Sequence, residues 1–154
     1  MNLSPHFTLE EMIKSQSGDR AGIDNLPPPA CREALRALCT HVLEPIRERF
    51  GPVVINSGYR GPELNRMVGG AASSQHCSGE AADIEVPGMS NADLARWVEK
   101  NLEYDQLILE CYKPGIPSSG WVHVSYKALK PNRKQELTAT VVNGKMNYTP
   151  GIAK

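Results

Sequence analysis

The chain has 154 residues, 40% of them hydrophobic, and this length predicts a single domain with a core of its own. Lysine and arginine together number 17, as do aspartate and glutamate, so no overall charge favours nucleic acid or an anionic membrane surface. No stretch approaches the roughly 20 apolar residues that span a bilayer. We therefore expect a monomer with no nucleic-acid partner and no membrane insertion.

Two further features concern the compartment in which the chain is made. Residues 1–7 contain no basic segment followed by an apolar run, so we expect no secretory signal and synthesis in the cytoplasm. The four cysteines lie at positions 31, 39, 77 and 111 and form no Cys-x-x-Cys pair. This spacing favours free thiols in a reducing compartment over a zinc ribbon or a redox motif.

The first half of the chain predicts two helical regions. Thr8 and Glu11 form a capping box, which predicts a short helix beginning just after Thr8. Residues 30–50 carry apolar side chains at helical spacing and form the main core helix. Pro45 removes a backbone donor and crowds the preceding turn, so we expect this helix to be kinked or divided near Leu43.

The remaining elements are short. Strands are expected at 53–55, 81–86, 106–111, 121–126, 136–142 and 145–148, and helices at 62–67 and 90–99. Asn143 and Gly144 suit a type I′ turn, so the last two strands should form a hairpin at about 136–149. The pattern predicts one α+β domain over residues 1–154, with a central antiparallel sheet and helices mainly on one face.

Residues 74–83 read Ser-Gln-His-Cys-Ser-Gly-Glu-Ala-Ala-Asp and contain two candidate metal ligands, His76 and Asp83. A third is His123, which lies in a run of β-forming residues, where alternation turns it away from the two flanking valines. Three nitrogen and oxygen ligands with an open fourth position suit a catalytic Zn²⁺. A histidine satisfied by local hydrogen bonds is the alternative for each position, and Cys77 is a weaker ligand candidate.

Two charged residues are candidates for the catalytic steps. If the loop 112–120 joins two antiparallel neighbours, Glu110 ends beside the strand of His123, where its carboxylate can act as general base. Arg60 offers a fixed positive donor for a substrate carboxylate or a developing oxyanion. An ordinary surface residue is the alternative in both cases.

Four more residues are candidates for binding substrate. Ser74 and Gln75 offer hydrogen bonds either to substrate or to the metal ligands. Trp121 forms either one wall of the substrate cleft or part of the core. Tyr59 precedes Arg60 and is grouped with these candidates.

Three segments resemble the zinc D-Ala-D-Ala peptidases, in particular their short single-domain branch from phages and prophages. They are Ser-x-His-x-x-Gly-x-Ala-x-Asp at 74–83, Ser-Gly-Tyr-Arg at 57–60 and Trp-Val-His-Val-Ser at 121–125. The resemblance covers about residues 5–127. It implies a fold like that of these peptidases and of hedgehog-type proteins, and it implies hydrolysis of a peptide bond in the stem peptides of bacterial peptidoglycan.

The same resemblance implies particular roles. One Zn²⁺ is held by His76, Asp83 and His123, and Arg60 supports the substrate or the transition state. The bond cut is either the terminal D-Ala-D-Ala link or the L-Ala-D-Glu link. Without a secretory signal, such a peptidase is expected to reach the cell wall after release through a membrane lesion or as part of a phage particle.

The chain departs from the resembled family at one place. Many members carry an acidic base three residues before the last histidine, or a further histidine two residues before it, and here these positions are Gly120 and Trp121. This leaves Glu110 as the replacement base. It also leaves a second hypothesis, a catalytically silent zinc-containing module that binds the cell wall or builds a virion, and a third, an interaction domain without metal.

Overall fold

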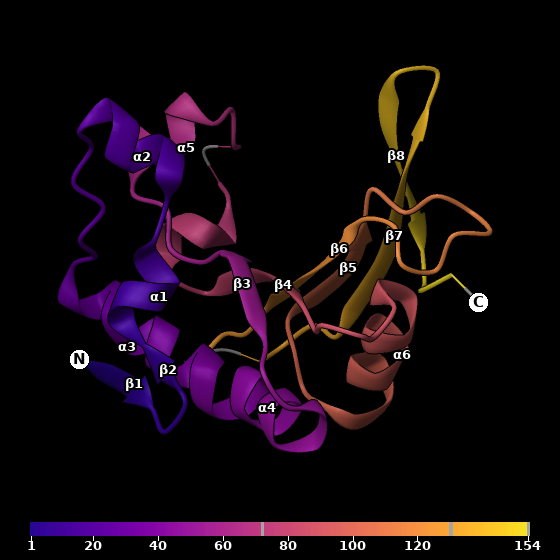
Figure 1. The fold of residues 1–154 in the computed structure, drawn as a ribbon, viewed down its shortest axis with the longest axis horizontal. Coiled ribbons are helices and arrows are strands. Elements are labelled where there is room, and N and C mark those ends of the chain that lie inside the picture. The colour runs from indigo at the N-terminus through magenta and orange to yellow at the C-terminus, as the bar shows by residue number, and fades with distance from the viewer. Residues whose placement is uncertain (72, 130, 154) are drawn as a thin grey trace.

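The structure is a computed structural model that describes residues 1–71, 73–129 and 131–153. Within that part of the chain a six-stranded sheet has the order β3-β4-β6-β5-β7-β8, and a separate ribbon pairs β1 with β2 (Figure 1). The strands are β1 Asn2–Ser4, β2 Phe7–Thr8, β3 Val54–Ser57, β4 Ala81–Glu85, β5 Gln106–Glu110, β6 Trp121–Ser125, β7 Gln135–Val142 and β8 Lys145–Pro150. This is the α+β domain that the sequence predicts.

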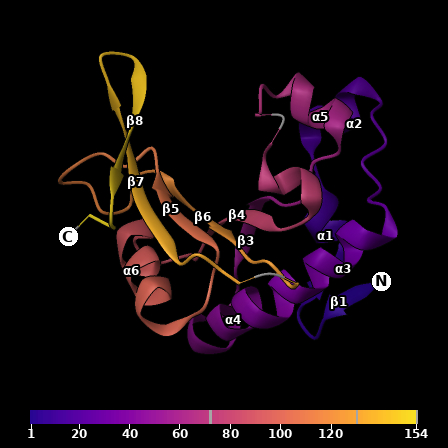
Figure 2. The ribbon, with the colours of Figure 1, turned by 180° about the vertical axis from the view of Figure 1, so that it is seen from behind.

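One helix covers the middle strands of the sheet, and most of the others lie beyond its β3 edge. They are α1 Leu9–Ile13, α2 Gln16–Ala21, α3 Pro29–Leu38, α4 Glu44–Phe50, α5 Pro62–Met67 and α6 Asn91–Asn101, with a 3₁₀ turn at Gln75–Ser78. In Figures 1 and 2, α1, α2, α3 and α5 lie on one side of the molecule, β5 to β8 and α6 lie on the other, and β3 and β4 connect them. No helix of the described residues is long and apolar enough to cross a membrane.

One pair of strands departs from the antiparallel sheet that was expected, because β5 and β7 run parallel. After β6 the chain passes to the far side of β5 and begins β7 beside the start of that strand, where Gln135 N donates to Asp105 O at 3.1 Å. Arg133 holds this crossing in place, because its side chain binds the buried carboxylate of Asp105 at 2.8 Å. A parallel partner is possible only after such a crossover, which residue periodicity does not reveal.

The main core helix is divided, as predicted, and the division takes the form of a π-helical turn. The turn spans Cys39–Leu43 between α3 and α4, and the N–H of Glu44 donates to the carbonyl of Cys39, five residues back. Pro45 follows immediately, and its ring would collide with the carbonyl four residues earlier in a regular α-helix. The wider turn relieves this collision at the point where the chain lacks a donor.

The core lies between one face of the sheet and the helices that cover it. Alternate strand residues such as Ile84, Leu107 and Val122 are fully buried on this face, together with Leu94 and Val98 of α6. Residues between them in the sequence point to the opposite face of the sheet. That opposite face remains free to carry polar side chains, and the candidate site is found there.

Local signals in the sequence are confirmed where the structure tests them. Thr8 caps α1 by accepting from Glu11 N at 3.2 Å. Asn143 and Gly144 have φ values of 52° and 77°, the left-handed conformations that a type I′ turn requires. All four cysteines are free thiols. The β1–β2 ribbon and α2 were not predicted.

Candidate active site

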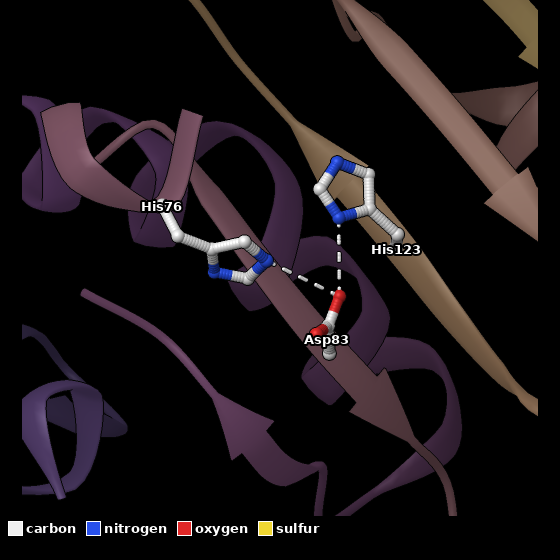
Figure 3. Close-up of side chains that lie close together, drawn as sticks. All are labelled: His76, Asp83 and His123. Atoms are coloured by element: carbon white, nitrogen blue, oxygen red, sulfur yellow. Dashed lines mark hydrogen bonds and ion pairs between the residues drawn. The ribbon is translucent and has the colours of Figure 1, made fainter. Parts of the chain in front are cut away.

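Three side chains meet on the open face of the sheet, and they are the three predicted metal ligands (Figure 3). His76 comes from the 3₁₀ turn, Asp83 from β4 and His123 from β6. The Oδ1 atom of Asp83 lies 3.4 Å from His76 Nε2 and 3.1 Å from His123 Nδ1. The structure thus brings together residues that are up to 47 positions apart in the chain.

His76 is held by the backbone of a segment that the sequence analysis treated only as part of a motif. Its Nδ1 lies 2.7 Å from the carbonyl oxygen of Gly58, and because a carbonyl only accepts, Nδ1 carries the proton and the lone pair of Nε2 faces Asp83. A Cβ at position 58 would overlap the carbonyl oxygen of Met12. Gly58 therefore permits the close approach that orients His76, and its place at the end of a strand was the available signal.

Asp83 and His123 are direct partners in the antiparallel pairing of β4 with β6. Val122 and Val124, on either side of His123, are fully buried on the core face. The predicted alternation is therefore confirmed, and His123 points to the open face. The cross-strand pairing fixes the distance between two of the three ligands without help from any loop.

The electrostatics of this group favour an ionised carboxylate. Burial alone would raise the pKa of Asp83, but the neighbouring imidazoles of His123 and His76 outweigh burial and hold it well below its usual range. Asp83 therefore remains an anion that faces both rings. A buried anion facing two imidazoles is the donor set that a borderline dication such as Zn²⁺ binds.

The geometry fits such an ion. The ligand atoms of the three residues all lie within 4.8 Å of one another. Tetrahedral Zn²⁺ with nitrogen and oxygen ligands at 2.0 to 2.2 Å needs ligand atoms about 3.3 to 3.6 Å apart. The 3.4 Å contact of Asp83 with His76 falls within this range, and the 3.1 Å contact with His123 lies just below it. Cys77 does not belong to this group of ligand atoms.

The three residues lie in a cleft of about 1680 Å³. The cleft also contains most of the residues predicted to act on substrate, namely Arg60, Ser74, Gln75, Glu110 and Trp121. It extends over the sheet face on one side and along α3 and residues 69–71 and 73–78 on the other. A cleft of this size accommodates a peptide several residues long.

Glu110 ends β5 and is paired with Trp121 on β6, as the hypothesis of two antiparallel neighbours required. Its Oε1 is buried and has no hydrogen-bond partner among the described residues. Burial raises the pKa of Glu110, the negative charge of Asp83 raises it further, and the charge of His123 partly offsets both. A carboxylate with a raised pKa and a free oxygen is suited to take up and release a proton during a reaction.

Gly120 explains in physical terms why this chain carries no acidic residue at that position. It has a φ of 73°, and a Cβ there would overlap the backbone carbonyl oxygen of Glu110. A glutamate or aspartate at position 120 is therefore excluded by the backbone of the neighbouring strand. The carboxylate in this part of the cleft comes from Glu110 instead, one strand further along the sheet.

Arg60 and Ser74 form one wall of the cleft. Arg60 Nη2 donates to Ser74 Oγ at 3.4 Å, and Arg60 Nε is buried with no partner in the described part of the chain. Ser74 Oγ also accepts from the backbone N–H of His76 at 3.2 Å and so caps the 3₁₀ turn. Arg60 therefore lines the cleft and keeps one donor that has no partner among the described residues, while Ser74 supports the ligand His76.

Gln75 has a structural partner that was not foreseen. Its Nε2 donates to Asp105 Oδ2 at 2.9 Å, and Asp105 is fully buried. The Oε1 of Gln75 is buried without a partner among the described residues and lies in the cleft lining. Asp105 therefore fixes the residue next to His76, a role that only the folded arrangement reveals.

The two aromatic candidates are placed differently. Trp121 lies partly buried in the cleft lining, and its Nε1 has no partner within the described residues. Tyr59 is only 4% exposed and packs in the hydrophobic core. It borders a smaller depression next to β3 and does not line the cleft, so the structure does not bring it to the site. Arg60 borders this depression as well, but unlike Tyr59 it also lines the cleft.

A pair of histidines and an aspartate at a cleft, with an unpartnered carboxylate beside them, define a site of the metallohydrolase class. The family model of peptidase M15 matches residues 5–125, which is most of the chain. The chain therefore belongs to the peptidase M15 family, whose class is that of hydrolases. The matched range contains His76, Asp83, His123 and Glu110. A search of curated proteins finds no match.

Proposed function

We propose that this chain is a zinc-dependent peptidase that hydrolyses a peptide bond in the stem peptides of bacterial peptidoglycan. The observation that carries the proposal is the buried Oε1 of Glu110, which has no hydrogen-bond partner among the described residues and belongs to the same cleft as His76, Asp83 and His123. A silent module has no need of such an atom, because leaving a buried polar group unpaired costs about 1 to 3 kcal/mol.

His76, Asp83 and His123 would hold the metal. A Zn²⁺ bound there supplies a Lewis acid, which polarises the scissile carbonyl and makes water a stronger acid. Glu110 accepts the proton of the attacking water and passes it to the nitrogen of the leaving amine. Trp121 is the cross-strand partner of Glu110 and lies beside it in the cleft lining.

Arg60 suggests which peptides are bound. Its guanidinium has an unused donor in the cleft and suits a carboxylate on the amine side of the scissile bond. The terminal D-Ala-D-Ala link and the L-Ala-D-Glu link share this feature, because each is followed by a D-residue with a free α-carboxylate. The proposal therefore covers both a carboxypeptidase and an endopeptidase, acting as a monomer encoded by a phage or prophage.

The test pairs zinc content with activity. Zinc is measured by elemental analysis, and activity is measured as release of amino groups from purified peptidoglycan, on the wild type and on Glu110→Gln. We expect about one zinc per chain in both proteins and a loss of turnover of about 10² to 10⁴ in the variant. Glu103→Gln is the matched control, because Glu103 is an exposed glutamate just before β5 and should lose nothing.

Three results would contradict the proposal in different ways. Zinc without turnover in the wild type would favour the module that binds the cell wall or builds a virion. Full activity in Glu110→Gln would remove Glu110 from the mechanism. Absence of zinc after loading would refute the assignment of His76, Asp83 and His123 as ligands.

A further inference from the structure

The C-terminal hairpin of β7 and β8 lies outside the segment matched by the family model, yet it reaches the cleft. The strand registers show how. In the parallel pair, Leu109 lies opposite Thr138, so Ala139 is next to Glu110. In the hairpin, Ala139 lies opposite Tyr148. Paired residues share a face of the sheet, so Tyr148 points to the same face as Glu110.

The cleft itself confirms this placement. Tyr148 lines the same cavity as Glu110 and His123, and its side chain is 51% exposed. Partial burial raises the pKa of the Tyr148 phenol, and the nearby charges of Glu110 and Cys111 raise it further. An aromatic ring that is half exposed beside a buried carboxylate has one surface available for a bound molecule.

The same face of the hairpin continues outward as an apolar strip. Val141 lies opposite Met146, and they alternate in phase with Ala139 and Tyr148. Val141 is 59% exposed and Met146 is 39% exposed. The hairpin projects beyond the rest of the sheet in Figures 1 and 2. Tyr148, Val141 and Met146 therefore form one apolar strip that begins in the cleft and leads away from it.

The order of strands relates this strip to the substrate. Arg60 follows β3 at one end of the sheet, Tyr148 lies on β8 at the other end, and the metal ligands of β4 and β6 lie between them. β8 is three strands from β6, which corresponds to about 14 Å across the sheet. An extended peptide covers this span in about four residues, and the length of the tyrosine side chain shortens it to two or three.

We propose that Tyr148 binds the acyl side of the peptide substrate, two or three residues before the scissile bond, and that the strip formed with Val141 and Met146 extends this contact. This inference rests on the proposed function, in which Arg60 binds the amine side of the same substrate. The hairpin thereby makes this chain selective for substrates that are long on the acyl side.

The test uses equilibrium binding and needs no turnover. Zinc-loaded Glu110→Gln is the parent, and each pair of probes shares its amine side but differs in acyl length. One pair is acetyl-D-Ala-D-Ala and the pentapeptide stem, and the other is acetyl-L-Ala-D-Glu and its muramoyl form. Dissociation constants are measured by calorimetry in the parent and after the further change Tyr148→Ala, Tyr148→Phe or Asn147→Ala.

For the probe pair that the parent binds, we expect Tyr148→Ala to weaken the long probe about tenfold and to leave the short one unchanged. Phenylalanine at this position should retain most of the affinity, because the ring makes the contact. Asn147 is the matched control, since it is exposed on the opposite face of the same strand, and Asn147→Ala should change neither affinity.

The inference is overturned if Tyr148→Ala binds the long probe as tightly as the parent. It is also overturned if both probes weaken equally while zinc content or melting temperature falls, because this would show a structural role for Tyr148. If the zinc-loaded parent binds no probe, the proposed function itself fails. This failure is distinct from failure of the inference, because it is seen in the parent, before Tyr148 is changed.

Discussion

Replacing Asp105 with asparagine tests the network that supports the candidate ligand His76. Asp105 is fully buried and accepts from the Arg133 backbone N–H at 3.0 Å, from Arg133 Nε and Nη2 at 3.1 and 2.8 Å, and from Gln75 Nε2 at 2.9 Å. Asparagine has nearly the same shape, but it has no charge and offers only one oxygen. Its NH₂ group would face donors at one of the two positions, so the hydrogen bonds to that position are lost in either orientation of the amide.

The loss of stability expected in Asp105→Asn can be worked out from the pKa of Asp105. Burial alone would raise this pKa, but the hydrogen bonds from Arg133 and Gln75 outweigh burial and lower it from 3.8 to about 2. A decrease of this size corresponds to ~2.5 kcal/mol of stability at neutral pH. The side chain of Arg133 is 51% exposed, so solvent screens part of the interaction and we expect about 2 kcal/mol.

The direction of the pKa shift of Asp105 determines how its contribution to stability depends on pH. Because the folded-state pKa of Asp105 is lowered, its contribution is fully present above pH 4 and is lost as the pH falls toward 2. The difference in free energy of unfolding between wild type and Asp105→Asn should therefore decrease to about half near pH 3. Urea denaturation at several pH values measures this difference. Asp93→Asn is the control, since Asp93 pairs with Arg96 on the surface and should cost less than 1 kcal/mol.

A difference that is small at pH 7, or that does not change between pH 7 and 3, would refute this reasoning. The zinc affinity of Asp105→Asn gives a second readout. Gln75 loses its anchor in this variant and is adjacent to His76 in the chain, so we expect weaker zinc binding by about tenfold. Unchanged zinc affinity would show that the network stabilises the fold without positioning the ligand.

Two further predictions concern the backbone and the metal. Gly120→Ala should lower the free energy of unfolding by about 3 kcal/mol and reduce turnover, because the new Cβ overlaps the Glu110 carbonyl at a φ of 73°. Gly144→Ala is the control: its φ is 77° but the space around it is open, so it should cost about 1 kcal/mol. Equal losses of stability in thermal melts of the two variants would contradict the steric argument. Zinc at a thousand times its dissociation constant should stabilise the wild type by about 4 kcal/mol. This stabilisation should disappear in His123→Ala, and its persistence there would place the ion elsewhere.

The parts of the fold and site that the sequence predicted depend on local signals. The Asn143-Gly144 turn needs only two residues with left-handed conformation. The direction of His123 needs only the alternation of side chains along one strand. The capping box of Thr8 and Glu11 lies within one turn of helix. In each case the deciding contact joins residues close in the chain, so tertiary packing did not override it.

The parts that were missed depend on contacts between distant segments. The carbonyl of Gly58 orients His76, and the backbone of Met12 leaves no room for a side chain at position 58. The parallel pairing of β5 with β7 depends on the contact of Arg133 with Asp105, which follows a crossover. The pattern of residues along the chain reveals neither the contact of Met12 with Gly58 nor that of Arg133 with Asp105. Such roles become visible only when the packing is known.

The chemistry of the cleft depends on the register of β5 against β6. A slip of one residue would turn the carboxylate of Glu110 into the core and bring Leu109 to the cleft. Ser125, at the end of β6, opposes such a slip, since its carbonyl accepts from Asp105 N at 2.8 Å and its hydroxyl accepts from Gln106 N at 3.0 Å. Asp105 is also anchored by Arg133, so the network that supports His76 fixes the position of the proposed base as well. His76 and the proposed base are therefore coupled through one buried residue, Asp105, and disturbing it should impair both together.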